Sequence, residues 1–347
     1  MKDELDEWAI SRALGRMAKY LPDRSKDTAL ALARNSIDPS ARIRALSGLI
    51  NVLPPIDHAA ALQEAQTALH SLSNPWLRVR SMLILALRLS PEAKDRILRE
   101  AFGTTLNIPN DWVRGRALNL IYGHLPADLI DRAIEAASKL QNLDMRTVAL
   151  SSMAARLSDP LTSEVLRDIP SIEDESLRAS ALNDLARRLT PDQLKHALSI
   201  AYGLQDETAR VDALSGLSQQ LAEPIKNKVI SEMLDITQHA DDGTRRAEML
   251  LLIVTRQPQV LSSSIVAEIT RAIQKTIGAD IRVDLFTKLA GLLPPEQRSI
   301  VLTEALSAAR SIENAAARAE ALSGLIGFIS IDQREAIVHE VLAMLQV

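Results

Sequence analysis

One phrase, written three times, constrains the fold more than any other feature of the sequence. RAEALSGLI (318–326) has close copies in RIRALSGLI (42–50) and RVDALSGLS (210–218). With the opening arginine of each copy as an anchor, similar segments recur at steps of 36, 36, 32, 32, 32, 36, 36 and 36 residues. The anchors are Arg42, Arg78, Arg114, Arg146, Arg178, Arg210, Arg246, Arg282 and Arg318, with Ile10 at the equivalent place 32 residues before the first. Such a period is typical of helical repeat arrays, and the two step lengths differ by about one helical turn.

The residues around each anchor predict a helix. Positions 3, 4, 7 and 11 after the anchor are mostly Ala, Leu, Ile or Met, a spacing that places them on one helical stripe. An Asp or Asn stands four residues before the anchor in nine of ten repeats, where it can cap the helix N-terminus. A proline follows the stripe in nine repeats, and a second helical segment then leads to the next cap. The hairpins begin near residues 6, 38, 74, 110, 142, 174, 206, 242, 278 and 314.

These hairpins predict the fold class. A single helix pair of this length cannot bury its own apolar face, so neighbouring pairs must stack. Hydrophobic residues make up 47% of the sequence but aromatic ones only 3%, so the core must be aliphatic, as helix–helix packing favours. We therefore expect an all-α chain of about twenty helices, forming one right-handed α-solenoid domain over residues 1–347.

The openings of the anchor helices resemble those of HEAT repeats. Asn-Pro-Trp-Leu-Arg (74–78) is similar to the Asp/Asn-Pro-x-Val-Arg start of the second HEAT helix, and Asp38-Pro39 with Arg42 follows the same pattern. Asn110 with Val113-Arg114 is also similar. The resemblance covers the whole chain and implies that the anchor helices line a concave side. It implies no particular function, because HEAT-like arrays serve many.

Charge and composition exclude several classes of protein. The net charge of −4 gives no general attraction to nucleic acid or to anionic membranes. Without cysteine there are no disulfides and no thiolate metal sites. The acidic start, MKDELDEWAI, differs from a secretory signal, and no apolar run approaches the ~20 residues that span a bilayer. We expect a cytoplasmic protein.

Catalytic motifs are missing from the sequence. The six histidines share no repeat position, and only His339-Glu340 forms a His-Glu pair, whereas HEAT-like di-iron hydroxylases use several. No Gly-Lys phosphate loop and no nucleophile-elbow serine motif occurs. We therefore expect a protein that is not an enzyme and has no cofactor and no metal site.

The anchor arginines and the positions beside them suggest different roles. The anchor guanidinium can bond the cap residue or a carbonyl of the preceding repeat, which is a structural role; the alternative is an arginine row that grips an anion. Two residues after the anchor, on the side of the helix opposite the apolar stripe, four basic residues open the array and four acidic residues close it. The eight are Arg12, Arg44, Arg80, Arg116, Asp212, Glu248, Asp284 and Glu320.

Aromatic and aliphatic residues add a candidate docking patch. Trp8, Trp76 and Trp112 stand two residues before the anchor position, four before an arginine on which they can stack. Leu83, Ile84 and Leu87 make the third anchor helix apolar nearly all round. Trp and Arg are typical binding hot spots, so we expect a hydrophobic and basic surface over repeats three and four. The alternative is that these side chains pack against neighbouring helices.

Two classes of function fit these features. The first is a non-enzymatic scaffold, adaptor or sensor whose concave face binds a protein or peptide, with Trp76, Trp112, Arg80 and Arg116 as anchors. The matching rows of opposite charge also permit self-association. The second is nucleic-acid binding, because HEAT-like DNA glycosylases use Trp, Arg and Asp on a concave face. The acidic residues of the C-terminal half oppose this second hypothesis, since they repel phosphate.

Overall fold

The computed structural model describes residues 2–346, with side chains from Asp6 onward. Within this range the chain forms twenty α-helices joined by loops and short 3-10 turns, without β-strands. The all-α prediction is therefore confirmed. The chain divides into two compact units, unit 1 (Met1–Ala101 and Ile277–Val347) and unit 2 (Phe102–Thr276). Among the described helices, none has both the length and the apolar composition needed to cross a bilayer.

The odd-numbered helices carry the anchor residues, and each forms a hairpin with the even-numbered helix that follows. The odd-numbered helices are α1 (Lys2–Met17), α3 (Pro39–Leu49), α5 (Pro75–Ala86), α7 (Asp111–Tyr122), α9 (Leu143–Ser152), α11 (Glu175–Leu185), α13 (Glu207–Leu217), α15 (Gly243–Arg256), α17 (Ala279–Leu292) and α19 (Ala315–Leu325). The even-numbered helices are α2 (Asp23–Asn35), α4 (Pro55–Ser71), α6 (Pro91–Leu106), α8 (Ile130–Ser138), α10 (Asp159–Asp168), α12 (Pro191–Tyr202), α14 (Ile225–His239), α16 (Ser263–Gln274), α18 (Arg298–Arg310) and α20 (Ile331–Leu345).

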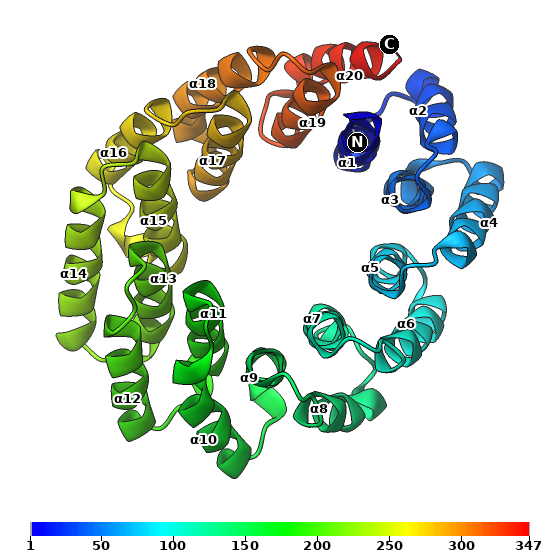
Figure 1. The fold of residues 1–347 in the computed structure, drawn as a ribbon. Coiled ribbons are helices and arrows are strands. Elements are labelled where there is room, and N and C mark those ends of the chain that lie inside the picture. Colours follow the sequence, from blue (N-terminus) through cyan, green and yellow to red (C-terminus); the bar gives the residue numbers. More distant parts are fainter. Residues whose placement is uncertain (1, 347) are drawn as a thin grey trace. The chain divides into compact units, whose positions relative to one another are not determined.

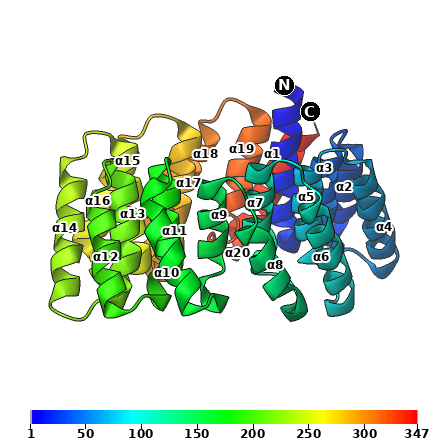
Figure 2. The ribbon, with the colours of Figure 1, turned by 60° about the horizontal axis from the view of Figure 1, so that its bottom comes forward.

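Unit 2 is built from hairpins that follow one another along the chain. Its odd-numbered helices, from α7 to α15, pack side by side in sequence order (Figures 1 and 2). The even-numbered helices cover one side of this row, and α8, α10, α12 and α14 each also contact the odd-numbered helix of the next hairpin. Small and aliphatic side chains fill the space between the layers, as expected from the scarcity of aromatic residues.

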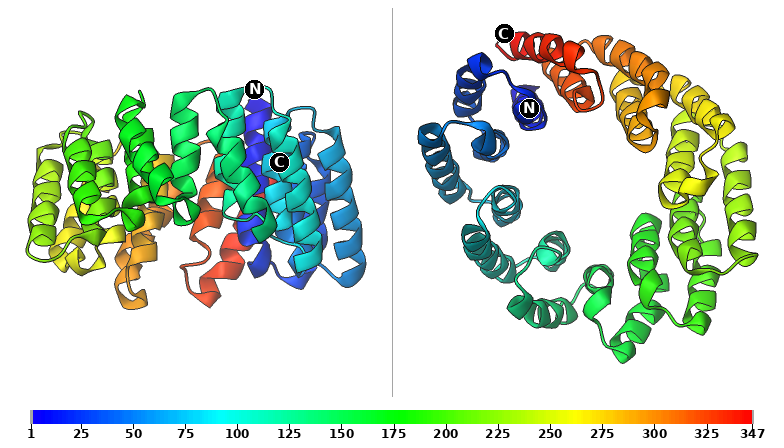
Figure 3. Two further views of the ribbon diagram at one scale, coloured as in Figure 1. Left: turned by 90° about the horizontal axis from the view of Figure 1, so that it is seen from below. Right: turned by 180° about the vertical axis from the view of Figure 1, so that it is seen from behind.

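Unit 1 joins hairpins from both ends of the sequence. Its odd-numbered helices lie in the order α17, α19, α1, α3, α5, and α1 packs between α19 and α3 (Figures 1 and 3). The first hairpin therefore stands beside the last one, in the place that a consecutive repeat would take. The sequence analysis did not anticipate this contact.

The predicted N-caps are present in eight hairpins. The side-chain oxygens of Asp38, Asn74, Asn110, Asn142, Asp174, Asp206, Asp242 and Asn314 accept backbone N–H groups of the first helical turn. The prediction for Asp6 is wrong, because α1 already begins at Lys2 and Asp6 lies inside it. Gly278 takes the cap position of α17 with φ of 100°, a left-handed conformation that glycine adopts easily.

Five of the nine anchor arginines have the structural role that the sequence suggested. Their guanidinium groups donate to the carbonyl six residues earlier, in the loop that closes the preceding hairpin, whereas Arg146 and Arg246 pair with Asp168 and Glu268 of their own hairpins. Such bonds, between 2.8 and 3.0 Å, join Arg42 to Ser36, Arg78 to Leu72, Arg114 to Ile108, Arg210 to Leu204 and Arg318 to Ile312. Each bond satisfies a carbonyl at a helix end that would otherwise lack a partner.

Carboxylates join successive hairpins in the opposite direction. Glu175 accepts the backbone N–H groups of Gln205 and Asp206 at 2.8 and 2.6 Å, and Asp111 accepts those of Gln141 and Asn142. These backbone hydrogen bonds lower the pKa of both carboxylates, and nearby arginines lower it further. Glu7 makes the same kind of bond to residues 37 and 38.

The glycine of the repeated phrase is needed where two helices approach closely. A Cβ on Gly48 would lie 2.5 Å from the Cα of Gly15, in the backbone of α1. At the equivalent position in the last hairpin, a Cβ on Gly324 would meet only the tip of the Arg16 side chain, at 3.3 Å. The same phrase therefore serves helix packing in one hairpin and leaves an open surface in another.

This difference predicts opposite effects of one substitution. Gly48→Ala should lower the free energy of unfolding by about 1–3 kcal/mol, because two backbones must move apart. Gly324→Ala should be neutral or stabilising by up to ~1 kcal/mol, because alanine favours the helix and the Arg16 side chain can move. Urea denaturation followed by circular dichroism measures both. Equal losses for the two variants would contradict the assignment.

The carboxylates that join hairpins predict loss of stability in acid. A folded-state pKa below the unfolded value, about 3.9 for Asp and 4.3 for Glu, stabilises the fold above pH ~4. That stability is lost as the pH falls through the lowered folded-state pKa. Between pH 5 and 3 the free energy of unfolding should therefore decline less steeply for Glu175→Gln than for the unaltered chain. Glu296→Gln, at an exposed site, is the control and should follow the unaltered chain.

Candidate functional site

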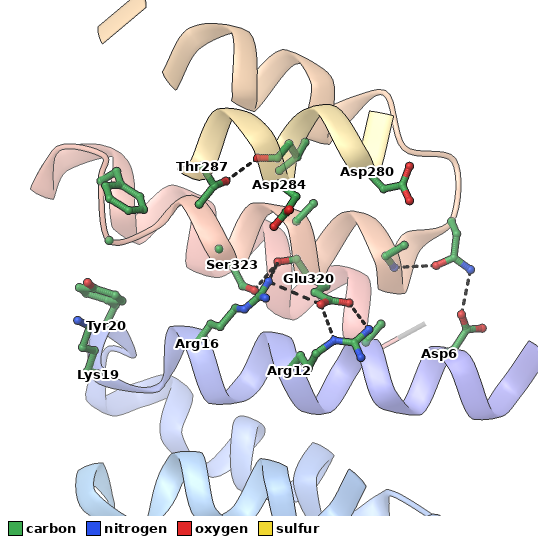
Figure 4. A pocket seen from close by; sticks show the side chains of 18 residues that line it. Asp6, Arg12, Arg16, Lys19, Tyr20, Asp280, Asp284, Thr287, Glu320 and Ser323 are labelled. Atoms are coloured by element: carbon green, nitrogen blue, oxygen red, sulfur yellow. Dashed lines mark hydrogen bonds and ion pairs between the residues drawn. The ribbon is translucent and has the colours of Figure 1, made fainter. Parts of the chain in front are cut away.

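An open groove lies on unit 1 where the first hairpin meets the last two (Figure 4). It has a volume of about 920 Å³, and its lining comes mainly from α1, α17 and α19. We call it the terminal groove. Arg12, Arg16 and Lys19 line it from α1 and the turn that follows, and carboxylates of α17 and α19 line the facing walls. The facing acidic residues are Asp280, Asp284 and Glu320.

An ion pair crosses the floor of the terminal groove. Arg12 donates through Nε and Nη2 to the two carboxylate oxygens of Glu320, with 2.6 Å for the Nη2 bond. Arg16 lies 3.6 Å from the same carboxylate and donates to the backbone carbonyl of Glu320 at 3.4 Å. Arg12 and Glu320 occupy the same repeat position in the first and last hairpins. The rows of opposite charge suggested that two chains could associate. For Arg12 and Glu320, however, the opposite charges pair within one chain.

Further contacts hold the two ends of the groove. Asn314, the cap of α19, donates from Nδ2 to Asp6 at 2.9 Å. At the far end the ring of Tyr20 lies between two cations, with Lys19 and Arg334 at 4.8 and 4.9 Å from its centroid. Such contacts favour a fixed ring with its hydroxyl near the groove.

A second group of arginines gathers around Trp8. The guanidinium groups of Arg44 and Arg80 lie 5.2 and 5.3 Å from the centroid of its ring. The expectation that Trp8 stacks on the arginine four residues later is wrong, because Arg12 turns to Glu320 instead. Burial lowers the pKa of Arg44 to about 10, and the nearby Arg80, Arg12 and Arg16 contribute to this shift. Arg44 nevertheless keeps its charge at neutral pH.

A smaller hollow of about 300 Å³ lies beside this group, between α1, α3 and α5. It shares Arg12 and Arg16 with the terminal groove, and Arg44 and Arg88 also line it. The remaining lining consists of Ser11, Gly15, Ser47, Gly48, Ile84 and Leu87. We call it the arginine hollow.

The expected apolar patch is smaller than the sequence suggested. Leu83 is buried, with 7% of its surface exposed, because α5 packs against α3 and α4. The prediction that Leu83 contributes to an exposed docking surface is therefore wrong, and the alternative, packing against neighbouring helices, holds for this residue. Ile84 and Trp76 are half-buried, and Leu87 is 51% exposed where it follows α5.

The other predicted residues lie apart from the terminal groove, with one exception. In unit 2, Trp112 is 45% exposed and stacks with Arg116 at 4.7 Å, as its four-residue spacing suggested. Asp212 pairs with Arg256 at 2.6 Å, and Glu248 is exposed. The exception is Asp284 of unit 1, which lines the terminal groove and pairs with Lys288 at 2.7 Å.

Several groove residues were missed by sequence reasoning. Arg16, Lys19, Tyr20 and Asp280 have no consistent counterpart in the repeat, and their importance follows from the packing of α1 on α19. One signal was available, because Arg12 and Glu320 have opposite charges at equivalent positions of the first and last hairpins.

A scan of the chain against models of known protein families finds no match, and a search of curated proteins finds none either. The resemblance to HEAT repeats thus remains a prediction from the sequence. Within residues 2–346, no three His, Asp or Glu side chains are arranged to hold a metal ion.

The ion pair at the groove floor predicts a measurable coupling. Arg12→Ala and Glu320→Ala should each destabilise unit 1, and the double variant should lose less than the sum of the two. Because the pair is bidentate but partly exposed, the expected coupling is about 1 kcal/mol. A double-mutant cycle from urea denaturation measures it. A coupling near zero would show that solvent screens the pair.

Proposed function

We propose that this chain is a right-handed, HEAT-like α-solenoid that acts in the cytoplasm as a non-enzymatic scaffold for a protein or peptide. The terminal groove carries this proposal. It is open and elongated, and it presents cations from one wall and carboxylates from the other. A peptide segment with side chains of both signs is complementary to such a surface.

The apolar parts of the groove support a peptide rather than a small ion as its occupant. Phe328, Tyr20 and Val283 line it together with Ala9, Ala317 and Ala321. Gly324 and Gly327 also line the groove, and their lack of side chains leaves room for the Arg16 guanidinium and the Tyr20 hydroxyl beside the last hairpin. Aromatic side chains beside charged ones are typical of binding hot spots.

The exposed Trp112 and Arg116 remain a proposed contact for a partner on unit 2. Their stacking fixes a broad aromatic surface, which lowers the entropy lost when a partner binds. Self-association through Asp212, Glu248 and Asp284 also remains a proposal, although Asp212 and Asp284 already have basic partners.

Nucleic acid is the weaker candidate partner. Asp6, Asp280, Asp284 and Glu320 all line the terminal groove, where their carboxylates would repel a phosphate backbone. A peptide can place its own basic side chains against these carboxylates, whereas a nucleic acid cannot.

The groove proposal can be tested with selected peptides. Random peptides displayed on phage are panned against the full chain, and the affinity of one synthetic selected peptide is measured by fluorescence anisotropy. Asp284→Lys reverses a charge on the exposed wall and should weaken binding about tenfold, which corresponds to ~1.4 kcal/mol. Asp332→Lys makes the same charge change on the exposed side of α20 and should leave the affinity unchanged.

Three outcomes would contradict the proposal. The first is a selection that enriches no peptide, and the second is equal weakening of binding by both charge reversals. Tighter binding of a DNA or RNA oligonucleotide than of any peptide, with a steep dependence on salt, would favour the nucleic-acid hypothesis instead.

A further inference from the structure

The arginine hollow contains positive charge that the protein itself does not neutralise. Arg12, Arg16, Arg44 and Arg88 line it, and no acidic side chain does so among the described residues. Glu320 pairs with Arg12 and Arg16 from the direction of the terminal groove. Among the side chains from Asp6 to residue 346, Arg44 and Arg88 have neither an ion-pair partner nor a side-chain hydrogen bond. This contrasts with the anchor arginines, several of which bond a backbone carbonyl.

Two polar atoms at the hollow are buried and lack a partner. The Nε of Arg44 and the Oγ of Ser47 are shielded from solvent without a hydrogen bond to any described residue. Ser47 is 1% exposed and lines the hollow. A buried donor without a partner raises the free energy of the fold by about 1–3 kcal/mol, so such atoms are rare and often mark a ligand position.

Equivalent serines elsewhere in the chain show that Ser47 is the exception. Ser151, Ser215 and Ser323 stand at the same repeat position, five residues after the anchor. Their hydroxyls donate to the backbone carbonyls of Thr147, Asp212 and Glu320 at 2.6, 2.8 and 2.6 Å. Ser215 also accepts a hydrogen bond from Arg256 at 2.7 Å. The Ser47 hydroxyl makes no such bond and is available to a ligand.

The surroundings of Arg44 favour an anionic ligand. Its guanidinium group lies against the ring of Trp8, with Arg80 on the same ring. Burial and the neighbouring arginines lower its pKa, which means that its positive charge is disfavoured there. A bound anion would offset this repulsion and hydrogen-bond the buried donors.

We infer that the arginine hollow binds an oxyanion, and that its ligand is the phosphate of a phosphorylated side chain in a peptide held by unit 1. A phosphate carries between about −1.5 and −2 charges and three acceptor oxygens, which match Arg44, Arg88 and the Ser47 hydroxyl better than a carboxylate does. Ile84 and Leu87 provide an apolar rim for the carbon atoms of the phosphorylated residue. The peptide part of this inference rests on the proposed function, whereas the oxyanion part does not.

The oxyanion part is tested with inorganic phosphate. Binding to the full chain is followed by isothermal titration calorimetry at low salt, with and without Arg44→Gln, Arg88→Gln and Ser47→Ala. Each arginine variant should weaken binding about tenfold, because it removes a positive charge and a guanidinium that can donate to the phosphate, and Ser47→Ala should weaken it several-fold, because it removes one hydroxyl donor. Thermal melts show whether each variant is folded. If Arg44→Gln does not fold, Arg88→Gln, at the exposed rim of the hollow, provides the test in its place.

Matched controls separate the hollow from general charge effects. Arg34→Gln removes the same charge on α2, where Arg34 pairs with Glu64, and should not change phosphate binding. Ser215→Ala makes the Ser47 substitution at the equivalent place in unit 2 and should also have no effect. Undetectable phosphate binding, or equal losses in variants and controls, would overturn the inference.

A peptide arm distinguishes the two sources of phosphate. A phosphoserine version of a groove-selected peptide should bind at least about tenfold more tightly than its serine version, and Arg44→Gln should remove this difference. Phosphate binding that depends on Arg44, without any gain for the phosphopeptide, would identify free phosphate as the ligand and overturn the peptide part. Failure to select any peptide, with phosphate binding intact, would count against the proposed function and not against the oxyanion site.

Discussion

The packing of α1 between α19 and α3 is the contact on which unit 1 depends. It brings two hairpins that lie 308 residues apart, measured from Arg12 to Glu320, into the relation that consecutive repeats have. In most helical repeat arrays the terminal repeats need polar outer faces, because nothing covers them. Here α19 covers one side of α1, and the Arg12–Glu320 pair and the Asn314–Asp6 bond lie along that boundary. The terminal groove exists because these helices meet.

Much of this architecture could be predicted because it depends on local rules. Two features follow from residues within one repeat: the caps from Asp38 to Asn314 and the proline-terminated hairpins. The bond from five of the anchor arginines to the preceding loop is similarly local. The meeting of α1 with α19 could not be predicted, because the two helices stand at opposite ends of the sequence and no residue pattern within one repeat specifies a contact between them. For the same reason the sequence revealed neither the terminal groove nor the contribution of Tyr20 and Arg16 to it.

The predicted site residues show that a helical pattern locates a position on the helix but does not determine its exposure. A position two residues after the anchor lies opposite the apolar stripe, which suggested an exposed row of charges. The structure instead gives most of these residues a partner or partial burial, because the odd-numbered helices pack against other helices of the same unit. Val148 occupies this position in α9 and is buried, whereas Glu248 in α15 is exposed. Pattern alone locates such a position on the helix but does not say what covers it.

The repeated phrase forms the same kind of helix in three hairpins, but the surroundings of its variable position differ. In α3, α13 and α19 the two leucines of the phrase are fully buried, and the residue two after the anchor is Arg44, Asp212 or Glu320. Arg256 pairs with Asp212 and donates a hydrogen bond to Ser215, so both polar side chains of α13 have a partner within the chain. Glu320 likewise has a partner within the chain, because Arg12 of the neighbouring hairpin donates to its carboxylate. Arg44 and Ser47, at the same two positions in α3, have no such internal partner among the described residues. Because the helices are otherwise alike, this difference reflects the side chains that surround each position, and it leaves the hollow beside α3 open to a partner from outside the chain.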